Sequence, residues 1–191
     1  MDGVDVRDLD VGDLRRAVAV VPQETPLFND TIGHNIHYGD LDATDDDVAA
    51  AADAANLGPL LKKLPKGMDT LVGDRGLKLS GGEKQRVALA RAILKDAPVC
   101  CFDEATSALD TETEAEIMAN LSAHARRRTT LVIAHRLSTV ADADLIVVLE
   151  DGRVAEQGTH SSLLERGGRY ADLWHAQSAT DAELSEDFTG S

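Results

Sequence analysis

The feature that most constrains the fold of this chain is an alternation of short, wholly apolar runs with longer segments of helical periodicity. The three apolar runs cover residues 98–102, 129–134 and 145–149. The segments with helical spacing cover residues 82–95, 111–127 and 137–141. Short runs without polar alternation are typical of strands buried on both faces of a sheet, and intervening helices allow parallel connections. The sequence therefore predicts an α/β fold with a mostly parallel sheet.

The N-terminal half adds one strand and a helical block. Residues 17–21 form an apolar run that ends at Pro22, which predicts a buried strand, and residues 23–35 have the composition of a loop. Thr44 is a candidate N-cap, because three aspartates follow it where carboxylates complement the helix dipole. A metal site at these aspartates is the alternative, and we favour the solvated helix start.

Charge and apolar content exclude several classes of protein. The 191 residues carry a formal net charge of −15, which repels phosphate backbones and argues against nucleic-acid binding. No apolar run approaches the ~20 residues that span a bilayer. Cys100 and Cys101 are adjacent inside an apolar run, so we interpret them as core thiols of a reducing compartment. We expect Trp174 to pack a terminal helix against the sheet and residues 178–191 to form a disordered acidic tail.

The segment most informative for chemistry is Leu79-Ser-Gly-Gly-Glu-Lys-Gln-Arg86, which leads directly into a helix. Gly81 and Gly82 expose backbone N–H groups at the helix start, and Ser80 adds a hydroxyl. Such a nest at a helix N-terminus is suited to binding phosphate oxygens. Taken alone, the same residues are equally consistent with a plain N-cap and turn.

Two further groups stand where predicted parallel strands end. Asp103 and Glu104 follow the apolar run that starts at residue 99, and His135 follows the run that ends at residue 134. A carboxylate at this edge of an α/β sheet can hold Mg²⁺ near a nucleotide, and a second one can orient or deprotonate a water. The histidine can stabilise a developing charge on phosphate. A solvated strand end and a structural histidine are the alternatives.

In combination, five motifs make the chain resemble the nucleotide-binding domain of an ATP-binding-cassette (ABC) transporter, over residues 3–177. They are the signature motif at 79–85, the Walker B strand with its glutamate at 99–104, the D-loop at 107–110, the switch-histidine loop at 133–138 and the Q-loop at 21–23. The resemblance implies the ABC ATPase core fold, incomplete at its N-terminus, with a helical signature subdomain over about residues 40–95 and the acidic tail after residue 177.

The resemblance also implies a role for each site residue. Two such domains pack head to tail, and each ATP lies between them. The signature residues that would contact the ATP of the opposing domain are Ser80, Gly81, Gly82 and Gln85. Asp103 and Gln23 would hold Mg²⁺, and Glu104 would be the general base. His135 would stabilise the transition state, and Asp110 would couple the two ATP sites.

Two loops make the chain similar to exporters in particular. Residues 70–76 resemble the loop that touches the coupling helices of the transmembrane partner, and the Gln23 loop is implied to do the same. The segments 22–32 and 76–79 resemble mitochondrial half-transporters for glutathione-linked sulfur or iron–sulfur precursors, and related heavy-metal exporters. This implies a homodimer or a half-transporter pair, held at the mitochondrial inner membrane in a eukaryote or at the plasma membrane in a prokaryote.

One family element has no counterpart in these 191 residues. No stretch matches GxxxxGK[ST], the P-loop whose backbone and lysine cradle the β- and γ-phosphates. We therefore expect a part of a longer ATP-hydrolysing transporter, with no ATPase activity in this chain alone. The alternatives are a natural P-loop-less partner or regulator of an intact ABC subunit, and an ABC protein of DNA repair or translation.

Overall fold

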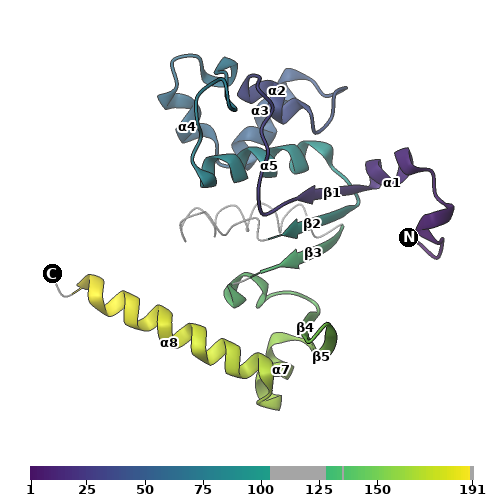
Figure 1. The fold of residues 1–191 in the computed structure, drawn as a ribbon, viewed down its shortest axis with the longest axis vertical. Coiled ribbons are helices and arrows are strands. Elements are labelled where there is room, and N and C mark those ends of the chain that lie inside the picture. Colours follow the sequence, from purple (N-terminus) through teal and green to yellow (C-terminus); the bar gives the residue numbers. More distant parts are fainter. Residues whose placement is uncertain (104–127, 135, 190–191) are drawn as a thin grey trace. The chain divides into compact units, whose positions relative to one another are not determined.

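The computed structural model describes residues 1–103, 128–134 and 136–189, with side chains described to residue 179 (Figure 1). The chain divides into two compact units, Met1–Ile133 and Ala134–Ser191. Each unit has its own core and is described by itself.

The first unit contains a parallel sheet and a set of helices. Its elements are η1 (Val6–Asp8), α1 (Val11–Ala17), β1 (Val18–Val21), α2 (Ile32–His37), α3 (Asp45–Ala54), α4 (Gly58–Lys63), η2 (Gly67–Asp69), α5 (Gly81–Lys95), β2 (Val99–Asp103) and β3 (Thr129–Ile133). The strand order is β1-β2-β3, and both pairs are parallel. This confirms the predicted α/β class. The prediction of a loop over residues 23–35 is wrong for its last residues, because α2 begins at Ile32.

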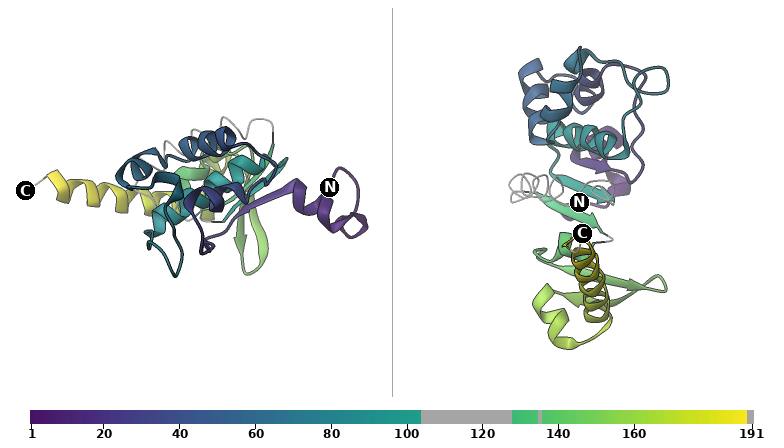
Figure 2. Two further views of the ribbon diagram at one scale, coloured as in Figure 1. Left: turned by 90° about the horizontal axis from the view of Figure 1, so that it is seen from above. Right: turned by 90° about the vertical axis from the view of Figure 1, so that its left-hand side faces the viewer.

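Helix α5 forms the middle layer of this unit. It contacts β1 on one side and α2 and α3 on the other, as Figure 1 and the right-hand view of Figure 2 show. The sheet face toward α5 buries Ala19, Val21, Cys100 and Phe102. The opposite face differs from the expectation of strands buried on both faces, because Val20 and Leu131 are more than half exposed there.

Both long helices of the first unit begin at a capping box. In α3, the Thr44 hydroxyl accepts from the Asp47 N–H, and the Asp47 carboxylate accepts from the Thr44 N–H at 2.9 Å. In α5, Ser80 and Glu83 make the same pair of bonds. Each box satisfies N–H groups that have no partner inside the helix. The predicted N-cap at Thr44 is confirmed.

The second unit combines a hairpin with two helices. Its elements are η3 (Leu137–Val140), β4 (Ile146–Glu150), β5 (Arg153–Gly158), α7 (His160–Arg166) and α8 (Arg169–Thr189). The strands are antiparallel, and the turn between them places Asp151 and Gly152 at positive φ, as a tight hairpin requires. Trp174 packs against the cluster of Ile146, Leu163 and Tyr170, as the sequence predicted.

The start of α8 is fixed by a carboxylate from β5. Glu156 accepts hydrogen bonds from the backbone N–H groups of Arg169 at 2.7 Å and Tyr170 at 3.1 Å. A side chain at Gly168 would collide with this carboxylate. The backbone of α8 then continues to Thr189, where the sequence predicted a disordered acidic tail from residue 178. Ala, Glu and Leu in that stretch have good helix propensity without an apolar stripe. The domain boundary at residue 177 stays a prediction.

Within the described ranges, none of the helices combines the length and the apolar character needed to cross a bilayer.

Candidate nucleotide-facing site

The first turn of α5 presents backbone N–H groups to solvent. Ser80 and Gly81 are exposed, whereas Leu79 just before them is buried and anchors the turn. The Ser80 hydroxyl accepts from the Glu83 N–H at 3.3 Å, and the Ser80 N–H donates to the Glu83 carboxylate at 2.7 Å. The remaining first-turn N–H groups have no intrahelical acceptor, so this helix start can receive an anion.

A cleft of about 570 Å³ joins this helix start to the segment that follows β1. Its lining residues are Gln23, Glu24, Thr25, Pro26, Gly81, Lys84 and Gln85. The structure therefore brings Gln23 next to Gly81 and Gln85, which the sequence identified from two separate motifs. Gln85 is nearly fully buried, and Lys84 supplies a positive charge at the exposed rim.

Asp103 is the last residue of β2, at the carboxyl edge of the parallel sheet. In the register of the sheet, Val21 pairs with Phe102, so Asp103 lies one residue beyond that pair and Gln23 lies two residues beyond it. Because parallel strands end at one edge, the carboxylate and the amide belong to the same edge. Both are hard oxygen donors of the kind that Mg²⁺ accepts, alongside phosphate and water.

Three predicted site residues lie outside the described residues: Glu104, Asp110 and His135. The roles assigned to them stay predictions.

The loop predicted to resemble an exporter element is fixed to the segment before α2. The Ile32 N–H donates to the Thr70 carbonyl at 3.0 Å, and the Val72 N–H donates to the Asp30 carbonyl at 2.9 Å. Gly73 adopts φ +94°, and a Cβ there would lie 2.6 Å from an oxygen of the Asn29 side chain. Glycine is required at this position both by conformation and by space.

Sequence reasoning missed Arg91 and Asn35. Asn35 is fully buried, and Arg91 of α5 hydrogen-bonds to it from the helix side that faces α2. Burial lowers the pKa of the Arg91 guanidinium from its ordinary value, although the group stays charged. The available signal was an arginine placed within the apolar repeat Val87-Ala-Leu-Ala-Arg-Ala-Ile-Leu94 of an otherwise buried helix face.

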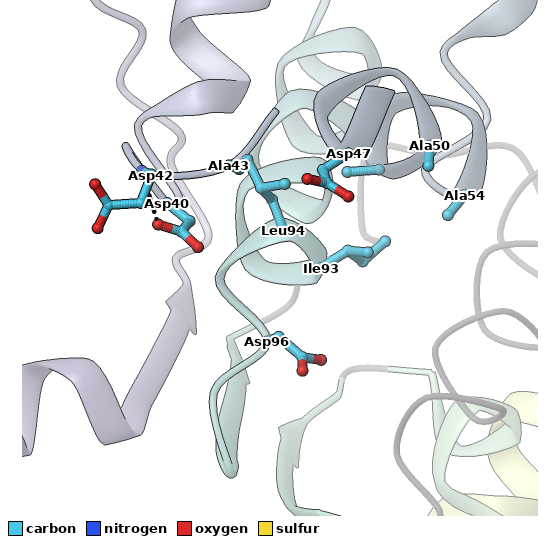
Figure 3. Close-up of a pocket in the computed structure, with 10 residues that line it drawn as sticks. Asp40, Asp42, Ala43, Asp47, Ala50, Ala54, Ile93, Leu94 and Asp96 are labelled. Carbon is cyan, nitrogen blue, oxygen red and sulfur yellow. Dashed lines mark hydrogen bonds between the residues drawn. The ribbon is translucent and has the colours of Figure 1, made fainter. Parts of the chain in front are cut away.

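A second pocket, of about 410 Å³, lies between α3 and the end of α5 (Figure 3). Four of its lining residues are aspartates: Asp40, Asp42, Asp47 and Asp96. Local structure accounts for two of them, since Asp47 completes the capping box of α3 and Asp96 pairs with Arg128. The hydroxyl and the N–H of Thr44 lower the pKa of Asp47. Among the side chains that the structure describes, no group of three or more His, Cys, Asp or Glu residues could hold a metal ion.

The two cysteines are free thiols, with Cys100 buried under α5 and Cys101 half-buried on the opposite sheet face. Burial raises the pKa of the Cys100 thiol, which disfavours the reactive thiolate. Both observations agree with the predicted structural role of Cys100.

A comparison with models of known protein families identifies the family of this chain. The family model for the ABC transporter domain matches residues 1–107, which is more than half of the chain. The chain belongs to the ABC transporter family.

Two similar proteins are named as an exporter and as a transporter of the ATM1 type. The chain is 55% identical over 186 residues to an "ATM1-type heavy metal exporter" of Novosphingobium aromaticivorans, a match covering 97% of this chain and 31% of that protein. It is 54% identical to the mitochondrial "Iron-sulfur clusters transporter atm1" of Aspergillus fumigatus, over 96% of this chain and 25% of that protein. The chain thus spans about a third or less of these relatives.

A solved structure gives the same result for the fold. The structure entitled "Structure of a bacterial Atm1-family ABC exporter with ATP bound" matches with a TM-score of 0.88 and 55% identity, over 92% of this chain and 31% of that one. This confirms the predicted fold class and the family resemblance.

Proposed function

We propose that this chain is the C-terminal part of the ATP-binding and ATP-hydrolysing domain of an ABC exporter. The observation that carries the proposal is the cleft that Gln23 shares with the N-terminal turn of α5. Asp103 adds to it, because it ends β2 at the sheet edge from which the chain runs on to Gln23. A phosphate-binding helix start and two magnesium-type oxygen donors are the groups that phosphoryl transfer needs. The family match and the ATP-bound neighbour support this interpretation.

In the proposed reaction, the chain supplies two different surfaces. The helix start at Ser80, Gly81 and Gly82, with Gln85 behind it, contacts the γ-phosphate of ATP held by a second nucleotide-binding domain. Asp103 and Gln23 would hold Mg²⁺, and the ion would supply positive charge that offsets the charge of the phosphates.

The remaining steps fall to residues beyond the described ranges. Glu104 accepts a proton from the attacking water, His135 stabilises the charge that develops on the γ-phosphate, and Asp110 links the two ATP sites. Hydrolysis then favours separation of the two domains, because ATP binds across their interface and ADP does not bridge it as well.

We further propose that the face around Phe28 and Tyr38 contacts a transmembrane domain. The two rings lie 4.6 Å apart between centroids, and their side chains are 44% and 56% exposed. Leu71, in the loop that hydrogen-bonds to the segment before α2, is also more than half exposed. Exposed aromatic side chains on an ordered surface are typical of binding sites for a protein partner.

The relatives support a proposal for the partner and for the transported compound. We propose that two copies, or two half-transporters, assemble and export glutathione-linked sulfur, iron–sulfur precursors or metal conjugates. The relatives are named as transporters of iron–sulfur clusters and heavy metals, which supports this class. The membrane would be the mitochondrial inner membrane in a eukaryote and the plasma membrane in a prokaryote.

The first test is the gene sequence upstream of codon 1. We expect an in-frame GxxxxGK[ST] motif preceded by apolar spans of ~20 residues. A promoter and ribosome-binding site immediately before Met1 would instead favour the alternative, a P-loop-less partner that offers only its signature face to the ATP of an intact subunit.

The second test is ATP hydrolysis by the full-length product in detergent or proteoliposomes. We expect Mg²⁺-dependent turnover that Glu104→Gln reduces by at least about a hundredfold, and no turnover by the 191-residue chain alone. Full activity of the Glu104→Gln variant would overturn the assigned general base. Absence of turnover in the unmodified full-length product would overturn the proposed function.

A further inference from the structure

A buried polar network ties the segment after Gln23 to the middle of α5, and the proposed nucleotide chemistry does not use it. Its centre is Asn35, which has no exposed surface. The Asn35 side-chain amide donates to the carbonyls of Phe28 at 3.1 Å and Thr31 at 2.9 Å, and its oxygen accepts from the Phe28 N–H at 2.8 Å. These bonds fold residues 28–35 into one closed unit.

Arg91 attaches that unit to α5. Its Nε donates to the Asn35 carbonyl at 2.5 Å, one terminal nitrogen donates to the Pro26 carbonyl at 3.0 Å, and the other donates to the Asn35 side chain. The guanidinium also lies 5.3 Å from the centre of the Phe28 ring. A planar fork can make these bonds and stack on a ring at the same time, which a lysine cannot do.

The backbone makes a second attachment at the far end of the segment. A Cβ at Gly39 would lie 2.4 Å from the Arg91 carbonyl oxygen, so the chain after α2 passes directly against α5. Tyr38, the preceding residue, packs on Phe28. Residues 26–39 are therefore held to α5 both where they begin and where they end.

We propose that Arg91 is a positioning residue that makes residues 26–39 follow the movements of α5. The consequence rests on the proposed function: α5 begins at the phosphate-facing turn, and residues 26–39 carry the exposed rings of Phe28 and Tyr38. Contact of ATP with one end of α5 thereby moves an aromatic surface that is attached about three turns along the helix. The arginine couples the two without touching the nucleotide.

The test is hydrogen–deuterium exchange with mass spectrometry on the full-length protein that contains this chain, in a Glu104→Gln background that prevents turnover. We expect Mg-ATP to slow amide exchange at residues 80–84 and at residues 26–39. Adding Arg91→Gln should keep the effect at 80–84 and abolish it at 26–39, with exchange there about tenfold faster even without ATP. Equal ATP protection of 26–39 with and without Arg91→Gln would overturn the proposal.

Two further variants keep the result interpretable. Arg15→Gln removes an exposed arginine from α1 and should leave both regions unchanged. Arg91→Lys keeps the positive charge but loses the planar guanidinium, so it should accelerate exchange at residues 26–39 less than Arg91→Gln does. It also tests the positioning role if Arg91→Gln fails to fold. If ATP protects neither region in the Glu104→Gln protein, the proposed function fails. In that case the positioning role of Arg91 is tested by amide exchange at residues 26–39 without ATP. If both Arg91 variants exchange there at the same rate as the parent protein, the positioning role is overturned.

Discussion

The two ends of α5 are held by contacts of opposite kinds. At its N-terminus, the bonds between Ser80 and Glu83 join residues three apart, and the turn itself is exposed. Toward its C-terminus, Arg91 bonds to Asn35, 56 residues away, and the Lys95 ammonium donates to the carbonyls of Arg15 and Val18, 80 and 77 residues away.

This difference separates two tasks within one helix. Local bonds are sufficient to shape a turn for anion binding, and they leave its outer surface available to a partner. Long-range bonds make the rest of the helix a rigid part of the first unit. The contrast can be tested by substitutions in α5 and in the elements that contact it. These substitutions should lower the free energy of unfolding by widely different amounts.

The largest effect is expected at the buried middle of α5. Leu89 has no exposed surface, so Leu89→Ala should lower the free energy of unfolding by about 3 kcal/mol through lost burial and a cavity. Urea denaturation followed by circular dichroism measures this, with Leu89→Met as the volume-matched control at under about 1.5 kcal/mol. A loss below about 1 kcal/mol would show that α5 is not the core helix of this unit.

The close approach of the chain after α2 should give the next largest effect. Gly39→Ala places a Cβ 2.4 Å from the Arg91 carbonyl oxygen, which forces the backbones apart at a cost of about 2 kcal/mol. Gly58→Ala is the matched control in the same denaturation experiment, because a Cβ there meets the Asp53 side chain at an ordinary 3.6 Å. Equal stability of the two variants would contradict the tight attachment of residues 26–39.

A smaller effect is expected at the N-terminus of α5. Ser80→Ala removes the hydroxyl that accepts from the Glu83 N–H and should cost about 1 kcal/mol of unfolding free energy. Ser80→Asp retains a cap and should recover most of that loss. Were Ser80→Ala as damaging as Leu89→Ala, the proposed contrast between the two ends of the helix would not hold.

The smallest effect concerns the corresponding capping box of α3 and depends on pH. The hydrogen bonds from Thr44 lower the folded-state pKa of Asp47 below its unfolded value of about 3.9. Stability from this carboxylate is therefore present above that pH and is lost as pH falls through the lower folded-state pKa. Thermal melts between pH 2 and pH 6 should show a shallower acid-side decline for Asp47→Asn than for the unmodified chain.

Much of the fold, and the positions of some candidate site residues on it, could be predicted from sequence because the signals are local. Apolar runs at 17–21, 98–102 and 129–134 predicted strands that the structure places at β1, β2 and β3. The glycine pair after Ser80 predicted a helix start, and Asp103 was predicted at a strand end; both are confirmed. Periodicity, caps and breakers depend only on neighbouring residues.

The sequence could not predict what depends on distant neighbours. The polar, turn-rich composition of residues 23–35 predicts a loop, yet α2 forms from Ile32, where Thr31 caps it and Asn35 is buried against α5. Likewise, an exposed sheet face around Val20 and Leu131 contradicts the simple expectation from apolar runs. An apolar run indicates that both faces of a strand can be buried. It does not indicate which other elements of the fold pack against each face.

By itself, the sequence determined the class of this chain, its parallel strands, the capped start of α5 and the residue types of the candidate nucleotide-facing site. Only the tertiary structure decided that Gln23 shares a cleft with Gly81 and that Arg91 holds residues 26–39 to the same helix. The physical reason is the range of the interactions. Capping and periodicity act over three or four residues, whereas a buried amide and a guanidinium 56 residues apart form their bond only after both helices have packed.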